Sequence, residues 1–296
     1  MTDTFSTYHP VVNFLYFGLV LVFSMCFMHP LCLLISLSCG FLWSVYLGGR
    51  KALRFNLAAM LPMVVLMALI NPVFSHRGAT ILAYFPNGNP LTLESILYGL
   101  AAAVMLGTVI LWFSCYNQVM TSDKFVYLFG RIIPSLSLIL SMVLRFVPKF
   151  KAQFLVVSHA QKCVGRDSSN GGVFSRVRHA IRILSIMVTW SLENAIETAD
   201  SMKSRGYGLS GRTAFSIYRF DGRDKTALCF TAFMGALVLV LAWKGELFWR
   251  YYPTLRGAPL TLWSCLAFLC YLSLCAMPLI LDRWEDRKWK HIASST

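Results

Sequence analysis

Charged residues are scarce in this sequence and unevenly distributed. Only 14% of the 296 residues are charged, whereas 57% are hydrophobic, which is far from the composition of a soluble domain. No Asp, Glu, Lys or Arg occurs from Pro10 to Gly49. A membrane span needs about 20 apolar residues, so this stretch suits two spans joined by a turn at Met28-His29-Pro30. We therefore expect an all-α, polytopic membrane protein.

Motifs that hold metals, nucleotides or nucleic acids are missing. The nine cysteines include no Cys-x-x-Cys pair, and the six histidines include no His-x-x-x-His pair, so no metal site is predicted. No Gly-x-x-x-x-Gly-Lys-Ser/Thr loop occurs, so any ATP and Mg²⁺ must be bound by partner chains and this chain needs no cofactor of its own. No RNA-binding or helix-turn-helix pattern accompanies the net charge of +14, which excludes nucleic acid as the expected partner.

The sequence also lacks the residue patterns expected of an enzyme or of a transporter that works without partners. No Ser/His/Asp arrangement emerges from the spacing of these residues, although a membrane-embedded enzyme stays as an alternative. Charges deep within spans would mark an ion path, and the apolar runs lack them. The excess of Lys and Arg has a simpler explanation, because basic residues gather in the cytoplasmic loops of membrane proteins.

About six spans are predicted. They cover residues 11–28, 30–47, 57–71, 93–113, 226–243 and 260–281. The expected loop 48–56 is basic and belongs in the cytoplasm, whereas loop 72–92 has the single charge Arg77 and belongs outside. Six spans leave both termini in the cytoplasm. The apolar run 125–148 is either a further span or a helix partly embedded beside the cytoplasmic face. We favour the non-spanning alternative, because a span would place the basic segment 149–180 outside.

The chain therefore divides into N-terminal spans (1–115), a cytoplasmic region (116–225) and C-terminal spans with a tail (226–296). Residues 145–225 contain 14 of the 27 Lys and Arg but six acids. Two amphipathic helices are predicted there from apolar side chains spaced by three, four or seven. The first stripe comprises Phe146, Phe150, Phe154, Val157 and Val164, and its helix should end near Gly165. The second comprises Ile181, Leu184, Val188, Leu192, Ala195, Ala199 and Met202, and its helix should be capped by Gly206 and Gly208.

Arg205 stands at the end of the second helix, where the helix dipole favours a cation. Its guanidinium presents a rigid set of N–H donors suited to carboxylates on a partner. A plainer interpretation is that both helices pack against the chain's own spans and that their charges are merely solvated. That interpretation accounts for most of the basic residues but explains Arg205-Gly206 less well.

The stretch Ala199-Asp200-Ser201-Met202-Lys203-Ser204-Arg205-Gly206 resembles the second Ala-Arg-Gly-type signature of the transmembrane T component of energy-coupling factor transporters, the EcfT and CbiQ-like proteins. Asn71-Pro72-Val73-Phe74-Ser75-His76-Arg77-Gly78 resembles another stretch of that family, as do Arg145-Phe146-Val147-Pro148 and Ala160-Gln161-Lys162. The similarity extends over most of the chain, and the Arg205 motif is its most specific part.

The resemblance implies a multi-pass protein of a prokaryotic cell membrane with three partners besides the lipid bilayer. These are two ABC-type ATPase subunits, in which the ends of two coupling helices insert, and a substrate-binding S component. Ala199, Ser204, Arg205 and Gly206 would form one docking end, and Cys163, Val164, Gly165 and Arg166 the other. The first signature departs from the family pattern, because its middle position is Val164 and Arg166 follows the glycine.

The implied role is mechanical coupling in an importer of a vitamin or a transition-metal ion. Asn71, Pro72, His76, Arg77 and Gly78 would contact the S component or simply form a capped turn. The alternatives are a subunit of a dedicated cobalt or nickel importer, and a membrane scaffold with no transport role.

Overall fold

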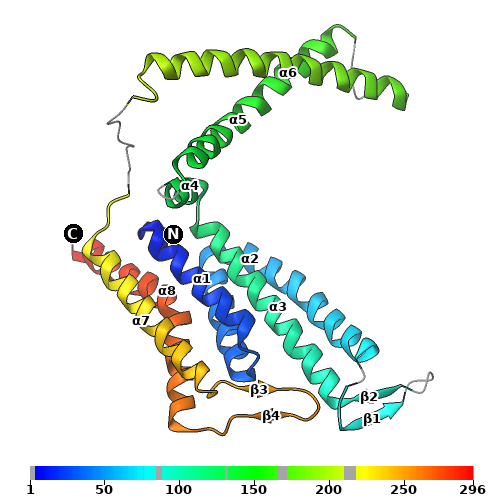
Figure 1. The fold of residues 1–296 in the computed structure, drawn as a ribbon, viewed down its shortest axis with the longest axis vertical. Helices are drawn as coiled ribbons and strands as arrows, with labels where there is room; N and C mark the ends of the chain where they lie inside the picture. The colour runs from blue at the N-terminus through cyan, green and yellow to red at the C-terminus, as the bar shows by residue number, and fades with distance from the viewer. Residues whose placement is uncertain are drawn as a thin grey trace. The chain divides into compact units, whose positions relative to one another are not determined.

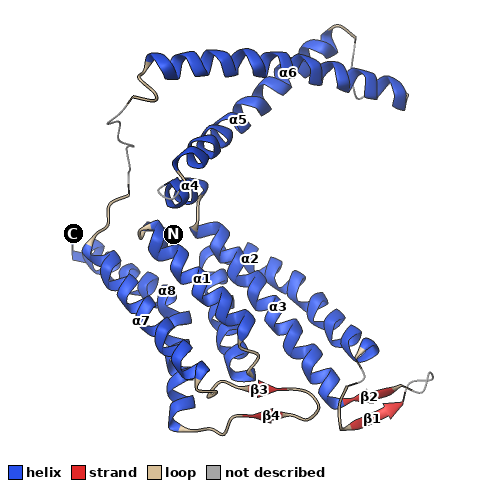
Figure 2. Ribbon diagram, in the orientation of Figure 1, coloured by secondary structure: helices blue, strands red, loops and turns tan. Residues whose placement is uncertain are grey.

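The computed structural model describes residues 4–75, 77–84, 89–130, 133–165, 172–209 and 218–295, which form helices and two short hairpins (Figures 1 and 2). They divide into two compact units, one of residues Met1–Lys124 with Tyr218–Thr296 and the other of Phe125–Ile217. The helices are α1 (Pro10–Cys26), α2 (Pro30–Phe74), α3 (Leu93–Val119), α4 (Ser122–Gly130), α5 (Pro134–Cys163), α6 (Val173–Ser204), α7 (Gly222–Trp243) and α8 (Leu262–Ser295), after a 3₁₀ turn at Phe5–Thr7.

The predicted spans coincide with helices of the first unit. In the described residues, α2, α3, α7 and the Leu262–Glu285 part of α8 are long and apolar enough to cross a membrane, and α1 is a shorter apolar helix. The 45 residues of α2 contain two predicted spans. Helix α5, which contains most of the ambiguous run 125–148, is not among the helices that meet this description. The prediction of an all-α, polytopic membrane protein is confirmed.

The predicted loop 48–56 is wrong. Helical structure continues through this segment, and the non-helical backbone is confined to Gly49, whose φ is 59° and ψ is −144°. Glycine adopts a positive φ without the steric cost of a Cβ atom, so the chain turns within one residue. The basic residues Arg50, Lys51 and Arg54 then lie on the next helical turns, and all three are exposed.

The segment 72–92, expected as a loop, contains a hairpin. Strands β1 (Ile81–Tyr84) and β2 (Pro90–Thr92) pair antiparallel, with Ala83 opposite Leu91. Glu94, at the start of α3, accepts hydrogen bonds from the Thr80 N–H and hydroxyl and thereby fixes the hairpin to α3. A second hairpin, β3 (Trp249–Arg250) with β4 (Arg256–Gly257), lies between α7 and α8.

Aromatic side chains fill the core of the membrane unit. Phe17 stacks on Trp43 with ring centroids 5.6 Å apart, and Trp112 lies 5.8 Å from Trp43. The Trp43 indole donates to the carboxylate of Asp282, which also accepts the Phe5 N–H at 3.0 Å. These buried contacts hold the N-terminal turn against α2 and α8, so the buried Asp282 supports the bundle from near one of its ends.

The turn between α1 and α2 forms as predicted, with His29 as its cap. Nδ1 of His29 accepts the N–H of Leu31, and Pro30 occupies the first helical position, where no donor is needed. Burial lowers the pKa of His29, because the charged imidazolium loses hydration. The folded state therefore favours neutral His29. The stability from this cap is present above the ordinary histidine pKa of about 6.5 and is lost as the pH falls through the lower folded pKa.

The full-length protein in detergent should accordingly melt at a lower temperature at acidic pH than at neutral pH. His29→Asn, which keeps a capping acceptor, should flatten that dependence. The exposed His159 on α5 provides the matched control, and His159→Asn should leave the pH profile unchanged. An unchanged slope in His29→Asn would assign the acid sensitivity to another group.

Candidate functional site

The candidate docking end of α6 is closed by a complete Schellman motif. Arg205 is the C-cap residue, and Gly206 follows with a φ of 75°. The Gly206 N–H donates to the Lys203 carbonyl at 3.0 Å, and the Tyr207 N–H donates to the Met202 carbonyl at 3.0 Å. These two bonds satisfy carbonyls that a helix end otherwise leaves unpaired. The backbone that presents Arg205 is therefore fixed by local hydrogen bonds.

The end of α5 repeats this backbone geometry. The C-cap Val164 has φ −86° and ψ 9°, against −85° and 11° for Arg205. Gly165 has a φ of 76°, and its N–H donates to the Lys162 carbonyl at 2.9 Å. The predicted helix ends at Gly165 and Gly206 are both confirmed. Val164 and Arg205 thus occupy equivalent positions at the ends of two long helices.

The side chains at these equivalent positions differ in chemistry but are both exposed. Val164 is 64% exposed, and the Arg205 side chain is also exposed. Among the described residues no carboxylate forms an ion pair with Arg205. Arg166 lies outside the described residues. The end of α6 therefore presents a cation at its C-cap position, and the end of α5 presents a branched hydrocarbon at the equivalent position.

The remaining predicted docking residues lie on the same helices. Cys163 is the last residue of α5, and its thiol is exposed. Ser204 is its counterpart on α6, where the hydroxyl donates to the Ser201 carbonyl at 2.9 Å. Ala199 is exposed more than a turn before the cap. In the described part of the chain, no three His, Cys, Asp or Glu side chains are grouped to hold a metal ion.

A polar contact between α5 and α6 was not predicted from the sequence. Nζ of Lys149 donates to Oδ1 of Asn194 at 2.6 Å and lies 5.4 Å from the centre of the Trp190 ring. The Trp190 ring meets Phe150 edge to face at 5.3 Å. Lys149 lies outside the apolar stripe of its helix, and this position was the sequence signal that could have indicated a polar contact. The contact joins the two helices whose ends carry Val164 and Arg205.

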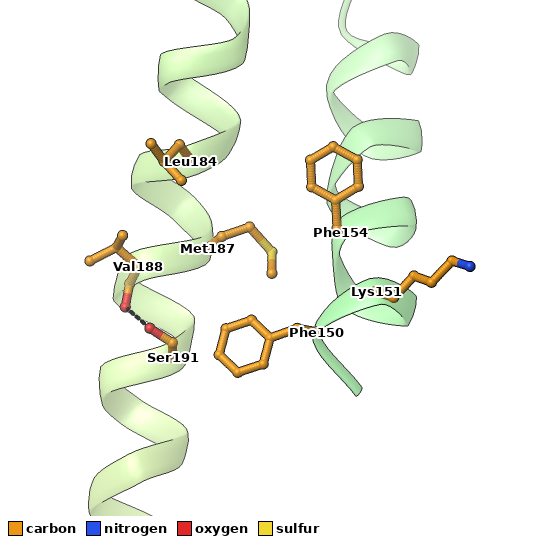
Figure 3. A pocket seen from close by; sticks show the side chains of 7 residues that line it. All are labelled: Phe150, Lys151, Phe154, Leu184, Met187, Val188 and Ser191. Atoms are coloured by element: carbon orange, nitrogen blue, oxygen red, sulfur yellow. Dashed lines mark hydrogen bonds between the residues drawn. The ribbon is translucent and has the colours of Figure 1, made fainter. Parts of the chain in front are cut away.

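The predicted stripe on α6 forms, but the side chains that are buried against α5 lie beside it. Ile183 and Met187 are 3% and 8% exposed and pack with Val157 of α5, whereas Ile181 and Leu184 are 60% and 62% exposed. Figure 3 shows Met187 directed toward Phe150 and Phe154 in a shallow apolar cavity of about 350 Å³. Leu184 and Val188 of the stripe line the same cavity, whereas Ile181 and Leu192 are 60% and 61% exposed. The plainer interpretation, that both helices pack against the chain's own spans, stays a prediction.

The second motif ties α2 to α3 and to the segment before α8. The Asn71 amide donates to the Ser95 carbonyl at 2.6 Å, and Ser75 and Tyr252 share a hydrogen bond between their hydroxyls at 3.2 Å. Pro72 lies within the last turns of α2. The Arg77 side chain is exposed, and its carbonyl accepts from the Thr92 hydroxyl.

Gly78 of this motif is packed tightly. A Cβ atom there would lie 2.5 Å from the Glu94 carboxylate, so only glycine fits without displacement. His76 lies outside the described residues. The described members of the motif make the contacts of a capped turn, one of the two predicted roles, and do not test contact with an S component.

Comparison with known proteins decides the family. The profile of one family, described as cobalt transport protein (CbiQ), matches residues 6–215. The chain belongs to this family. It is a transmembrane component of the energy-coupling factor type, as the resemblance around Arg205 predicts.

Three relatives illustrate the match, each named as an energy-coupling factor transporter transmembrane protein. One from Listeria monocytogenes is 25% identical over 78% of this chain and 89% of its own length. One from Bacillus selenitireducens is 24% identical over 76% and 88%. One from Lactobacillus helveticus is 32% identical over 36% of this chain, which spans only 39% of that relative.

Proposed function

We propose that this chain is the coupling subunit of an energy-coupling factor importer. Two ABC-type ATPase subunits receive the ends of α5 and α6, and a separate S component binds the transported vitamin or transition-metal ion. ATP and Mg²⁺ belong to the ATPases, and this chain performs no chemistry of its own. Binding and hydrolysis of ATP move the two helices, and that motion reorients the S component. The protein lies in a prokaryotic cell membrane with both termini in the cytoplasm.

The observation that carries this proposal is the repeated helix end. Two helices of 30 and 32 residues end in the same glycine-terminated backbone geometry, and each exposes its cap side chain. A single such end is an ordinary helix terminus. Two equivalent ends on two packed helices suit a partner that supplies two equivalent sites, as a pair of ATPase subunits does. The Lys149–Asn194 contact supports the same role, because it couples the movement of one helix to the other.

A dedicated cobalt or nickel importer is the second candidate. The description of the matching family as cobalt transport protein favours it, whereas the relatives named for the energy-coupling factor carry no substrate in their names. Both candidates assign the same mechanical role to this chain and differ in the S component.

Affinity purification of the full chain from its native membrane tests the proposal. We expect mass spectrometry to find ABC-type ATPase subunits and a small membrane protein in the same complex. Uptake of the S component's ligand by proteoliposomes should require ATP. Recovery of the intact chain with neither ATPase would support the scaffold alternative, and turnover of a substrate by the chain alone would support an enzyme.

A further inference from the structure

The first half of α6 exposes a continuous apolar surface. Val173 and Phe174 are 78% and 83% exposed, Val177 is 52% exposed, and Ile181 and Leu184 are 60% and 62% exposed. At about 100° per residue, Ile181 lies about 160° around the helix from Ile183, which packs against α5. Phe174 and Ile181 are therefore on the side of α6 away from its partner helix, whereas Leu184 lies nearer to α5 and lines the cavity with Phe150 and Phe154. The five apolar side chains of this surface are too exposed for a helix that water alone surrounds.

Charge along α6 is segregated. Three arginines, Arg176, Arg178 and Arg182, lie in its first ten residues, and no acid occurs from residue 168 to 192. The acids Glu193, Glu197 and Asp200 all lie in the second half. The first turn contains no acid, and Gly172 provides no side-chain cap. An anion beside this segment would be stabilised both by the arginines and by the positive end of the helix dipole.

Two of the arginines border the apolar surface. Arg178 and Arg182 are exposed and lie about 60° and 100° around the helix from Ile181, both on the same side. A helix that lies in a membrane interface has this arrangement, with apolar side chains among the acyl chains and arginines extending to the phosphates. Helix α6 is not among the described helices apolar enough to span the bilayer.

We propose that residues 173–184 bind the surface of an anionic phospholipid bilayer. Val173, Phe174 and Ile181 enter the boundary between headgroups and acyl chains, and Arg178 and Arg182 bind the lipid phosphates. The bilayer is the favoured occupant because the chain continues into a membrane helix on both sides of this unit, at Val119 of α3 and Gly222 of α7. This tethering gives the segment a high effective concentration of lipid without any further partner. The site is separate from the ATPase-docking ends.

The test uses the full chain in nanodiscs, without ATPases or S component. Val177→Cys, in a background with the native cysteines replaced, carries a polarity-sensitive fluorophore at a position that is 52% exposed and does not line the cavity beside α5. Its emission should shift to the blue in discs of mixed phosphatidylcholine and phosphatidylglycerol, relative to phosphatidylcholine alone. About 0.5 M salt should weaken the shift, because it shortens the Debye length to a few ångström. The measurement is repeated with the fluorophore on Ile181→Cys, so that the result does not depend on a single labelled position.

The decisive comparison is between two double variants, each of which removes two positive charges, one from the first half of α6 and the other from its C-terminal end. Arg178→Gln with Arg182→Gln should lower the ratio of docked to undocked segment about 30-fold, from about fivefold per charge. Lys203→Gln with Arg205→Gln should leave this ratio unchanged, although it should impair ATPase assembly. Equal emission in the two lipid compositions would overturn the proposal. So would equal losses in the two double variants, or a shift that appears only after an acidic partner protein is added.

Discussion

Arg205→Glu should prevent stable assembly with the ATPase subunits while the membrane helices stay folded. The guanidinium is exposed at a fixed helix cap, and no carboxylate among the described residues pairs with it. Its charge is therefore available to a partner. Loss of one desolvated charge pair costs about 2–5 kcal/mol, which corresponds to at least a roughly 30-fold loss of affinity. The introduced carboxylate would add repulsion from any acid in the ATPase groove.

Lys203→Glu is the matched control, because it reverses the same charge on the same helix. The positions are two residues apart in sequence, so the side chains point about 160° apart around the helix axis. Titration of the purified ATPases onto each variant in detergent would give the two affinities. An Arg205→Glu protein that binds as tightly as the parent would refute the docking role. An equal loss in Lys203→Glu would instead show that general charge on α6 matters and that the capped position does not.

Local chemistry made the candidate site predictable. The Schellman motif at Arg205-Gly206 depends on a left-handed residue and on hydrogen bonds within six consecutive residues, so the sequence of this helix end contains the whole cause. Gly165 likewise has a positive φ, and its N–H donates to the Lys162 carbonyl. The apolar runs predicted the membrane helices equally well, because hydrophobic length alone determines whether a helix can span.

Features that depend on tertiary context could not be predicted. Helix α6 carries apolar side chains on two faces, and periodicity alone does not show whether Ile183 or Ile181 faces α5. Strand β1 (Ile81–Tyr84) of the first hairpin is short and exposed, and its position depends on Glu94 in the following helix. Basic residues after Gly49 resemble a loop in composition, but an exposed helical turn accepts the same residues. For α6 and for the hairpin, the deciding contact lies outside the local sequence pattern.

Arg205→Ala should impair uptake much more than Arg166→Ala, because the two helix ends present different side chains at the same position. The helix α5 ends at Cys163, and Gly165 reverses the backbone directly before Arg166. The residue that corresponds to Arg205 is therefore Val164, which can bind an ATPase groove only through apolar contacts. A difference of more than about 1.4 kcal/mol between the two contributions would appear as a more than tenfold difference in uptake.

Arg205→Val extends this test by giving both ends the same side chain. If the polar contact of Arg205 carries the coupling, the valine variant should lose uptake as severely as the alanine variant, since the added hydrocarbon cannot replace the guanidinium. Uptake is measured in cells with equal membrane amounts of each variant. Val164→Ala should have a smaller effect, because it removes only apolar contact. Comparable losses in Arg205→Ala and Arg166→Ala would show that Arg166 serves the first end despite its place beyond the glycine, and the asymmetric arrangement would then be wrong.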